Sequence, residues 1–420
     1  MPMQPMTTSP SPWTRALKRA LGGLTLTVLG FTGAVHAQNQ PFGSHRQTYH
    51  ASTLSVSAGT AAADNATADF YWKWKSRYVK PACHAGDYRI QASTDGGAYV
   101  VSEGQGFGML VTVMMAGKDP EARTLFDGLH RYNRRHPSAG NPDLTAWAQD
   151  IHCNDVLENS SATDGDLDIA YALLLAHKQW GSAGAINYSA EATRVLTAIA
   201  QSNINPVTRL TNLGDWARWP SDPNFYYATR SSDWMLGHFR GFIGRAGTDW
   251  AQVLNAHQTL LETMQSRYAS STGLLPDFIT NTHTGTPTPA AAYFLESPND
   301  GSYSWNACRV PWRLGIDAAI SGDSRTRNSV GLLSRWIRSK TGSNPNNIRA
   351  GYYLNGNQIE SYTDMAFIAP FAVAATADSG GQAWLDSLWA RIVSAPPEDY
   401  YGDTIKMLSM LSVSRNWMTP

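Results

Sequence analysis

The pattern of apolar and polar positions predicts a chain built almost entirely of helices. Apolar residues recur at steps of three and four, with polar residues between them, whereas alternating patterns typical of strands are scarce and short. The connecting segments are long and rich in Gly, Pro, Asn and aromatic residues, which is typical of functional loops. The predicted helices span residues 106–116, 120–135, 166–180, 191–201, 232–245, 249–268, 307–320, 325–339, 364–375, 383–394 and 401–412.

Two stretches within these helices, residues 169–175 and 365–375, are apolar nearly all round. A helix of this kind must be covered on every side, as in an inner ring that an outer ring surrounds. The pattern therefore favours an all-α toroid of paired inner and outer helices. The alternative is an open superhelix of helical pairs, which would show a repeat of about 35–45 residues. The sequence shows no such period.

Residues 1–37 have the features of a signal peptide. The basic residues Arg15, Lys18 and Arg19 precede an apolar run at 21–35, which is too short to span a bilayer comfortably. Small residues around Ala37 provide a cleavage site. We therefore expect cleavage after Ala37 and a secreted protein, extracellular or periplasmic; the alternative is an uncleaved membrane anchor.

The rest of the chain divides into two parts. Residues 38–68 are rich in Ala, Ser and Thr with little apolar periodicity, which predicts a linker or flexible N-terminal arm. Residues 69–420 show no second low-complexity break and are expected to form one globular domain. A single domain of this length is consistent with a closed helical ring.

The charge balance excludes some classes of function. The sequence holds 33 Lys and Arg against 33 Asp and Glu, and the predicted signal peptide contains three of the basic residues and no acidic one. The remaining chain is mildly acidic, so it lacks a strongly basic nucleic-acid surface and gives no reason to expect membrane binding after signal cleavage.

Three cysteines are too few for a disulfide scaffold. In an oxidising compartment one pair could form, and Cys83 with Cys153 is the expected pair because both lie in sequence typical of loops. Cys308 lies in an apolar helical pattern and is expected to be a small buried residue.

Two glycine-interrupted segments place carboxylates where apolar helices begin: SEGQGFG at 102–108 and SATDGDLD at 161–168. Acids held in this way can point into a shared cavity and perform acid–base chemistry on a neutral polymer, although a lone acid such as Glu103 can also simply stabilise the helix dipole. The spacing of Asp164 and Asp168 imitates an EF-hand loop, but Ile169 and Leu175 stand where that loop requires Gly and Glu. Since no Cys/His cluster has zinc spacing either, we expect no metal and no cofactor.

Several separated motifs resemble glycoside hydrolase family 8, and the similarity runs from about Trp72 to Trp417. They are SEGQGFGM at 102–109, ATDGDLDIA at 162–170, KQWG at 178–181, LGDW at 213–216, TGLLPDF at 272–278 and NACRVPWR at 306–313. The resemblance implies an (α/α)6 barrel, with residues 69–420 as the single catalytic domain. It also implies hydrolysis of a β-1,4-linked glycan with inversion, which needs a carboxylic acid and an opposing carboxylate base.

The motifs assign the catalytic roles. Glu103 matches the proton donor of the family, and Asp164 matches the aspartate at the scissile sugar. In many members the general base is an aspartate directly before Ala-x-Arg. This chain has Asn306 at that position, and a neutral amide cannot accept a proton from water. Another branch of the family supplies its base from a loop upstream, and Glu296 matches that base. Asp300 is the alternative base.

The same resemblance suggests the sugar contacts. Trp147 and Trp216 match positions that stack sugar rings, in keeping with the affinity of pyranose C–H faces for aromatic surfaces. Asp168, Asp215, Tyr303, Asn306 and Arg309 are the other predicted substrate-binding residues.

The sequence therefore predicts a secreted, monomeric, cofactor-free endo-glycanase whose partner is its polysaccharide substrate. The branch with the loop base resembles enzymes that act on chitosan, on β-1,3-1,4-glucan or on both, and these two substrates stay open. Cellulose ranks third. The alternative from another class of function is a non-catalytic toroid that binds polysaccharide. A protein that only binds needs no paired acid and base, and this argues against the alternative.

Overall fold

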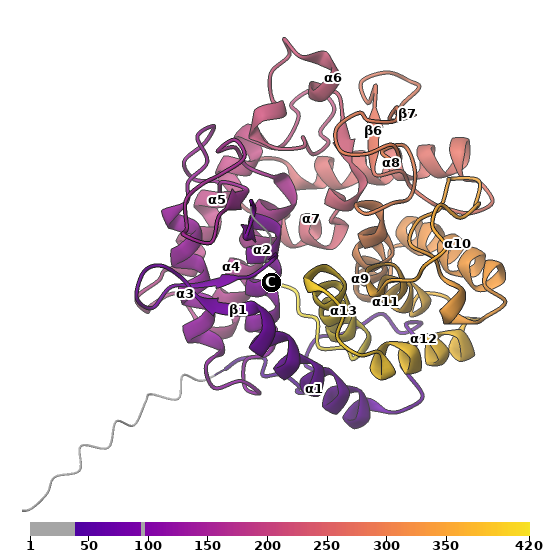
Figure 1. Ribbon diagram of the computed structural model, residues 1–420, viewed down its shortest axis with the longest axis horizontal. Helices are drawn as coiled ribbons and strands as arrows, with labels where there is room; N and C mark the ends of the chain where they lie inside the picture. Colours follow the sequence, from indigo (N-terminus) through magenta and orange to yellow (C-terminus); the bar gives the residue numbers. More distant parts are fainter. Residues whose placement is uncertain (1–37, 94–96) are drawn as a thin grey trace, which may run out of the picture. The chain divides into compact units, whose positions relative to one another are not determined.

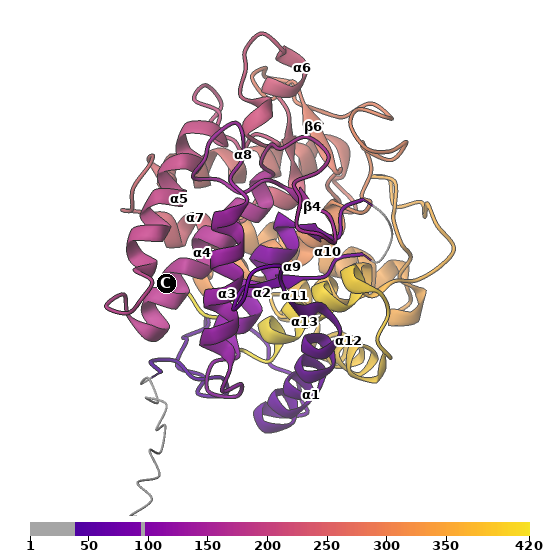
Figure 2. The same ribbon diagram turned by 60° about the vertical axis from the view of Figure 1, so that its left-hand side comes forward.

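Six helices form a closed inner ring in the computed structural model, which describes residues 38–93 and 97–420 (Figures 1 and 2). Each contacts the next in the order α2, α4, α7, α9, α11 and α13, and α13 contacts α2 again. The ring closes because these contacts return to their starting helix. The bounds are α2 Ser102–Met114, α4 Thr163–Trp180, α7 Leu236–Phe242, α9 Val310–Ser321, α11 Met365–Ala375 and α13 Tyr400–Val413.

An outer helix packs against each inner helix (Figure 1). In chain order α1 packs on α13, α3 on α2, α5 on α4, α8 on α7, α10 on α9 and α12 on α11. This arrangement is an (α/α)6 barrel, and the predicted fold class is confirmed. The outer bounds are α1 Thr60–Tyr78, α3 Ala122–Arg135, α5 Tyr188–Ser202, α8 Trp250–Tyr268, α10 Ser324–Lys340 and α12 Gln382–Ser394.

The inner helices are buried on nearly every side because the outer ring covers them. Every residue of α11 is buried, as is the whole stretch 169–175 of α4. The outer helices bury one stripe and expose the other, as amphipathic helices do. Of the helices in the described residues, none is long and apolar enough to cross a membrane.

All eleven predicted helices are present, with small shifts of their ends. The segment predicted at 232–245 is the most altered, because the 3-10 helix η2 (Ser231–Asp233) precedes a shorter α7. Further short elements are the helix α6 (Pro223–Tyr226) and the 3-10 helices η1 (Asp215–Ala217), η3 (Ala307–Arg309) and η4 (Pro345–Asn347).

The prediction of a linker or flexible arm at residues 38–68 is wrong. Residues 60–68 form the first turns of α1, whose buried face starts with the small residues Ala63 and Thr67 and therefore shows little apolar periodicity. The segment before α1 lies against the barrel: Phe42 donates its backbone N–H to the carbonyl of Ala116 (2.7 Å), and Leu54 donates to Thr376 (2.8 Å). The predicted signal peptide at 1–37 lies outside the described residues and stays a prediction.

Short antiparallel strand pairs connect the helices. β3 (Val100–Val101) runs directly into α2 and pairs with β4 (Ala148–Gln149), so the start of α2 is tied to the loop that carries Trp147. The other strands are β1 (Val79–Pro81), β2 (Tyr88–Ile90), β5 (Thr229–Arg230), β6 (Phe278–Thr280) and β7 (Thr288–Pro289), which pair as β1–β2 and β5–β6–β7.

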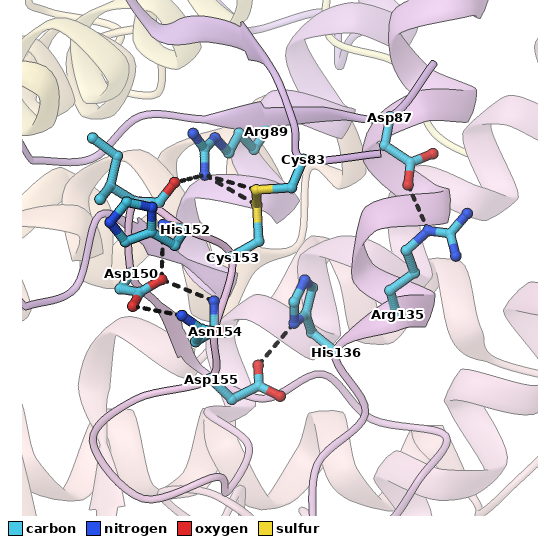
Figure 3. Close-up of a disulfide and its surroundings, with 11 residues drawn as sticks. Cys83, Asp87, Arg89, Arg135, His136, Asp150, His152, Cys153, Asn154 and Asp155 are labelled. Atoms are coloured by element: carbon cyan, nitrogen blue, oxygen red, sulfur yellow. Dashed lines mark hydrogen bonds and ion pairs between the residues drawn. A yellow bond between two sulfur atoms is a disulfide. The ribbon is translucent and has the colours of Figure 1, made fainter. Parts of the chain in front are cut away.

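The structure contains the predicted disulfide between Cys83 and Cys153 (Figure 3). It joins the loop after β1 to the loop after β4 across 70 residues of sequence. Arg89 donates to the carbonyl of Ile151 (2.8 Å) beside it. Cys308 is a free, buried cysteine in η3, as predicted.

Candidate active site

A cavity of about 840 Å³ opens where the inner helices α2, α4 and α13 begin. Its size is within the range of ligand-binding clefts in proteins. Loops that follow the outer helices supply the rest of the wall. The lining residues are Val101, Ser102, Glu103, Trp147, Leu157, Glu158, Ser160, Ser161, Ala162, Asp164, Leu213, Trp216, Arg230, Leu295, Glu296, Trp305, Asn306, Arg309 and Tyr401.

Glycines bring the first two carboxylates together. A Cβ atom on Gly106 would lie 2.7 Å from the Cβ of Asp168, and one on Gly165 would lie 2.7 Å from the backbone carbonyl carbon of Ser102. Any larger residue would therefore push α2 and α4 apart. The glycine-interrupted motifs allow the two helix starts to touch, so that Glu103 and Asp164 reach the same end of the barrel.

Glu103 lies in the first turn of α2 with its side chain 17% exposed. Burial raises the pKa of Glu103 to about 7, and the negative charge of Asp164 adds to the increase, whereas Arg309 opposes it. The acid form of Glu103 is thus well populated near neutral pH. A general acid needs this property.

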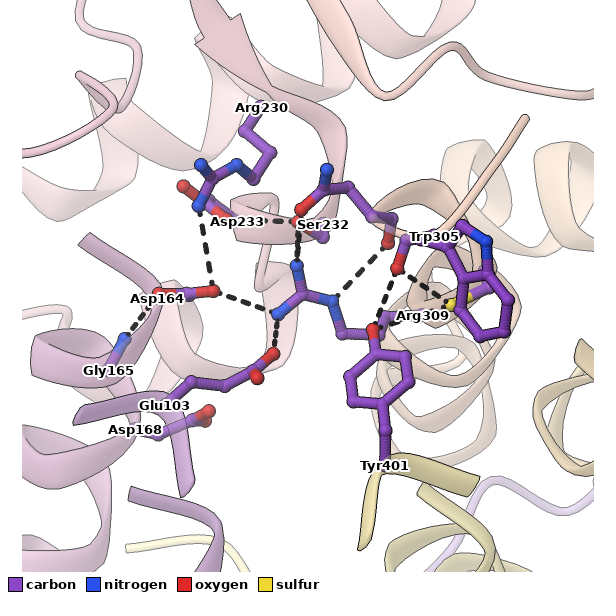
Figure 4. Close-up of polar contacts among 12 residues, drawn as sticks. Glu103, Asp164, Gly165, Asp168, Arg230, Ser232, Asp233, Trp305, Arg309 and Tyr401 are labelled. Carbon is purple, nitrogen blue, oxygen red and sulfur yellow. Dashed lines mark hydrogen bonds and ion pairs between the residues drawn. The ribbon is translucent and has the colours of Figure 1, made fainter. Parts of the chain in front are cut away.

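Asp164 and Glu103 share one guanidinium, that of Arg309 (Figure 4). Its Nη1 donates to Glu103 and, over 2.8 Å, to Asp164 Oδ2, while its Nη2 donates to Ser232 (2.8 Å). Burial alone would raise the pKa of Asp164, but Arg309 and Arg230 together hold it below its usual value. Asp164 therefore stays charged beside Glu103.

Glu296 lies in the same cavity, and its side chain is 44% exposed. Arg230 donates to Glu296 Oε1 (2.9 Å), and the amide of Asn306 donates to Oε2 (2.7 Å). Arg230 also lies 3.8 Å from Asp164. Charges of alternating sign therefore connect Glu103, through Arg309, Asp164 and Arg230, to Glu296.

Asp300, the alternative base, is buried and does not line the cavity. Its carboxylate accepts hydrogen bonds from the backbone N–H groups of Leu295 (2.7 Å), Glu296 (3.0 Å) and Ser297 (2.8 Å). Asp300 thus shapes the loop that presents Glu296, and of the two predicted bases Glu296 is the one that lines the cavity.

The structure corrects two predicted sugar contacts, Asp168 and Asp215, because both are buried and neither lines the cavity. Asp168 is fully buried and binds both terminal nitrogens of Arg313 (2.8 and 2.5 Å) and Nε2 of His238 (2.8 Å). Asp215 is 1% exposed and accepts from Ser138 Oγ (2.5 Å) and the backbone N–H of Ser161 (2.9 Å). Both carboxylates are used by protein donors.

Tyr303 is the third correction. It is fully buried, and its ring packs near Phe367 and Phe371 rather than in the cavity wall. Of the predicted substrate-binding residues, Trp147, Trp216, Asn306 and Arg309 do line the cavity.

Several residues of the cavity wall were not predicted from the sequence: Leu157, Glu158, Arg230, Trp305 and Tyr401. Trp305 adjoins Asn306, so its place next to a recognised motif could have indicated it. Arg230 carries no such signal, because its role depends on the opposing loop that holds Glu296.

No group of three or more His, Cys, Asp or Glu residues within residues 38–93 and 97–420 is arranged to hold a metal ion. Carboxylates and aromatic side chains both line the cavity: Glu103, Asp164 and Glu296 among the acids, and Trp147, Trp216, Trp305 and Tyr401 among the aromatics.

Comparison with known proteins agrees with this geometry. The family model for glycosyl hydrolases family 8 matches residues 44–415. A beta-glucanase from Niallia circulans is 44% identical over 388 residues, covering 92% of this chain and 93% of the relative. An endoglucanase from Bacillus sp. (strain KSM-330) is 38% identical over 369 residues, covering 85% of this chain and 77% of the relative. The apo structure of a beta-1,3-1,4-glucanase from Paenibacillus sp. X4 superposes with a TM-score of 0.87 at 43% identity, covering 91% of this chain and all of that one.

Proposed function

Because the chain belongs to glycosyl hydrolases family 8, and is therefore a glycoside hydrolase, we propose that it is an inverting endo-glycanase that cleaves β-1,4 linkages in β-1,3-1,4-glucan. The observation that carries the proposal is the meeting of Glu103 and Glu296, from distant parts of the chain, in one cavity with tryptophans in its wall. The similar beta-glucanase and beta-1,3-1,4-glucanase support this choice of substrate.

In the proposed reaction Glu103 donates its proton to the glycosidic oxygen as the bond to the anomeric carbon breaks. Glu296 removes a proton from a water molecule that attacks that carbon from the opposite face, which inverts its configuration. Asp164 holds the ring at the cleavage site in a distorted shape and keeps Glu103 protonated by its charge.

Asn306 orients the base in this mechanism. Its Nδ2 donates to Glu296 Oε2, and its Oδ1 accepts from Arg309 (3.0 Å). The amide at this position thus links the base to the arginine that binds the acid. A neutral side chain at position 306 is compatible with catalysis because the loop supplies the carboxylate of Glu296.

Chitosan is the second candidate substrate. Four carboxylates line the cavity (Glu103, Glu158, Asp164 and Glu296), against the two guanidinium groups of Arg230 and Arg309. An excess of negative charge attracts a polycationic glycan. Glucan ranks first because Arg230 and Arg309 neutralise much of that charge by direct pairing with three of the four.

A reducing-end assay on lichenan, chitosan and carboxymethyl cellulose tests the proposal. We expect the fastest release on lichenan, with viscosity falling early because cleavage is internal. NMR of the initial product should show the α-anomer. Binding without new reducing ends on all three glycans would contradict the enzymatic proposal, whereas fastest release on chitosan would move the substrate to the second candidate.

Export is proposed on separate grounds. The predicted signal peptide at 1–37 and the disulfide Cys83–Cys153 both support an oxidising compartment. When the full chain is expressed in a bacterial host, we expect protein outside the cytoplasm with an N-terminus at Gln38. Recovery of intact chain from the cytoplasm alone, by mass spectrometry of fractionated cells, would contradict export.

A further inference from the structure

The tip of the loop after β4 forms one wall of the cavity. Leu157 and Glu158 both line it, next to Trp147, and 54% of Leu157 is exposed. The indole N–H of Trp147 donates to the carbonyl of Leu157 (2.8 Å). A hydrogen bond therefore joins the tip to Trp147, a predicted sugar-stacking residue.

The backbone of this tip is in an unfavourable conformation. Leu157 has φ 56° and Glu158 has φ 61°, so two successive residues with a Cβ adopt the left-handed region. Tight turns that need two such residues usually contain Asn-Gly, because a side chain crowds the backbone there. Leu and Glu are thus poor choices for the stability of this turn. Strained residues of this kind concentrate at functional sites.

Surrounding contacts hold the tip in place. The Cys83–Cys153 disulfide anchors the loop four residues before Leu157 (Figure 3). Val156 donates its backbone N–H to Ala148 (3.0 Å), and Trp147 donates to Ser160 (2.9 Å), so both sides of the tip are tied to the β4 segment. The backbone of the tip is consequently held in place without any ligand.

The two side chains are turned to the cavity and to solvent more than to other parts of the protein. Among residues 38–93 and 97–420, Glu158 has no hydrogen-bond or ion-pair partner for its carboxylate. Leu157 leaves half of its surface exposed in a cavity wall. Replacing both residues would increase the stability of the turn, but it would remove two side chains that line the cavity.

We propose that Leu157 and Glu158 are substrate-binding residues, held in a strained turn so that they contact the sugar next to the one on Trp147. The Leu157 side chain covers the C–H face of this sugar, and the Glu158 carboxylate accepts hydrogen bonds from its hydroxyl groups. This assignment rests on the proposed function, since it needs a glycan in the cavity.

The double variant Leu157→Asn/Glu158→Gly tests the proposal by supplying the residues that the backbone prefers. We expect its Tm to rise and its KM for lichenan to increase by about tenfold with kcat little changed, because a charge-assisted hydrogen bond and an apolar contact with bound sugar are lost. Ser343→Gly is the matched control: Ser343 also has a positive φ (60°) but is exposed away from the cavity, so only Tm should rise.

A rise in Tm with unchanged KM would show that the turn is structural and would overturn the proposal. If the double variant folds poorly, Glu158→Gln and Leu157→Ala keep the backbone, and at least one must raise KM. Wild-type inactivity on lichenan would overturn the proposed substrate instead. The variants are then compared on chitosan or carboxymethyl cellulose, whichever the wild type cleaves. If it cleaves neither, calorimetric titration with cello-oligosaccharides replaces the kinetics. An unchanged KM or affinity in that comparison would again overturn the role of the turn.

Discussion

Replacing Glu296 by glutamine is expected to lower kcat on glucan by about 10²–10⁴-fold while oligosaccharide binding is retained. The amide keeps the size of the side chain, and its oxygen can still accept the hydrogen bond from Arg230. Its NH2 group replaces the oxygen that accepts from Asn306, and the amide cannot accept a proton from water. Kinetics on lichenan and calorimetric titration with an oligosaccharide measure the two effects separately.

A rescue experiment distinguishes loss of the base from loss of structure. Azide attacks carbon without giving up a proton, so it should restore part of the rate of Glu296→Gln and yield a glycosyl azide. Glu262→Gln is the matched control, since Glu262 lies on the outer helix α8, 46% exposed and paired with Arg325. It should behave as wild type. Substantial turnover by Glu296→Gln without azide would show that this residue is not the base.

Replacing Glu103 by glutamine is expected to reduce kcat on glucan by a similar factor of about 10²–10⁴, for a different reason. The sugar leaving group is a poor one without a proton, whereas a dinitrophenolate leaves unaided. We therefore expect the variant to retain much of its rate on a dinitrophenyl β-glucan oligosaccharide. Equal losses on both substrates would contradict the role of Glu103 as the acid.

The pH dependence of the wild type follows from the same residue. Glu103 must carry its proton to act, and burial raises its pKa to about 7, so kcat/KM should fall as the pH rises through about 7. Below that pH the acid form of Glu103 predominates, so the protonation of Glu103 no longer limits the rate. A profile of kcat/KM between pH 5 and 9 checks this, and Glu103→Gln on the activated substrate should lack the alkaline limb.

The helical ring could be predicted because its signals are local. The spacing of apolar residues located eleven helices, and stretches such as 365–375 that lack a polar face indicated an inner ring. The outer helix α1 was missed for an equally local reason. Its first buried positions are Ala63 and Thr67, and small residues produce little contrast between a buried and an exposed face.

The candidate site was predictable where each residue acts through its own motif. Glu103 and Asp164 stand at helix starts next to glycines that the packing of α2 on α4 requires, and the structure places both in the cavity. Glu296 was assigned by resemblance alone, and the structure places it in the same wall. Arg230 was not predicted, because an arginine between two carboxylates is recognisable only once their loops meet.

By itself the sequence determined which segments are helical and which carboxylates begin them, because both depend on residues within one or two turns. Only the tertiary structure decided which of those acids reach the cavity. Asp164 and Asp168 share one face of α4, but one helical turn lies about 5.4 Å deeper, and at that depth Asp168 meets Arg313 and His238. Both aspartates pair with arginines, but Asp168 does so outside the cavity wall, whereas Asp164, a turn nearer the opening, lines the space that a sugar can enter.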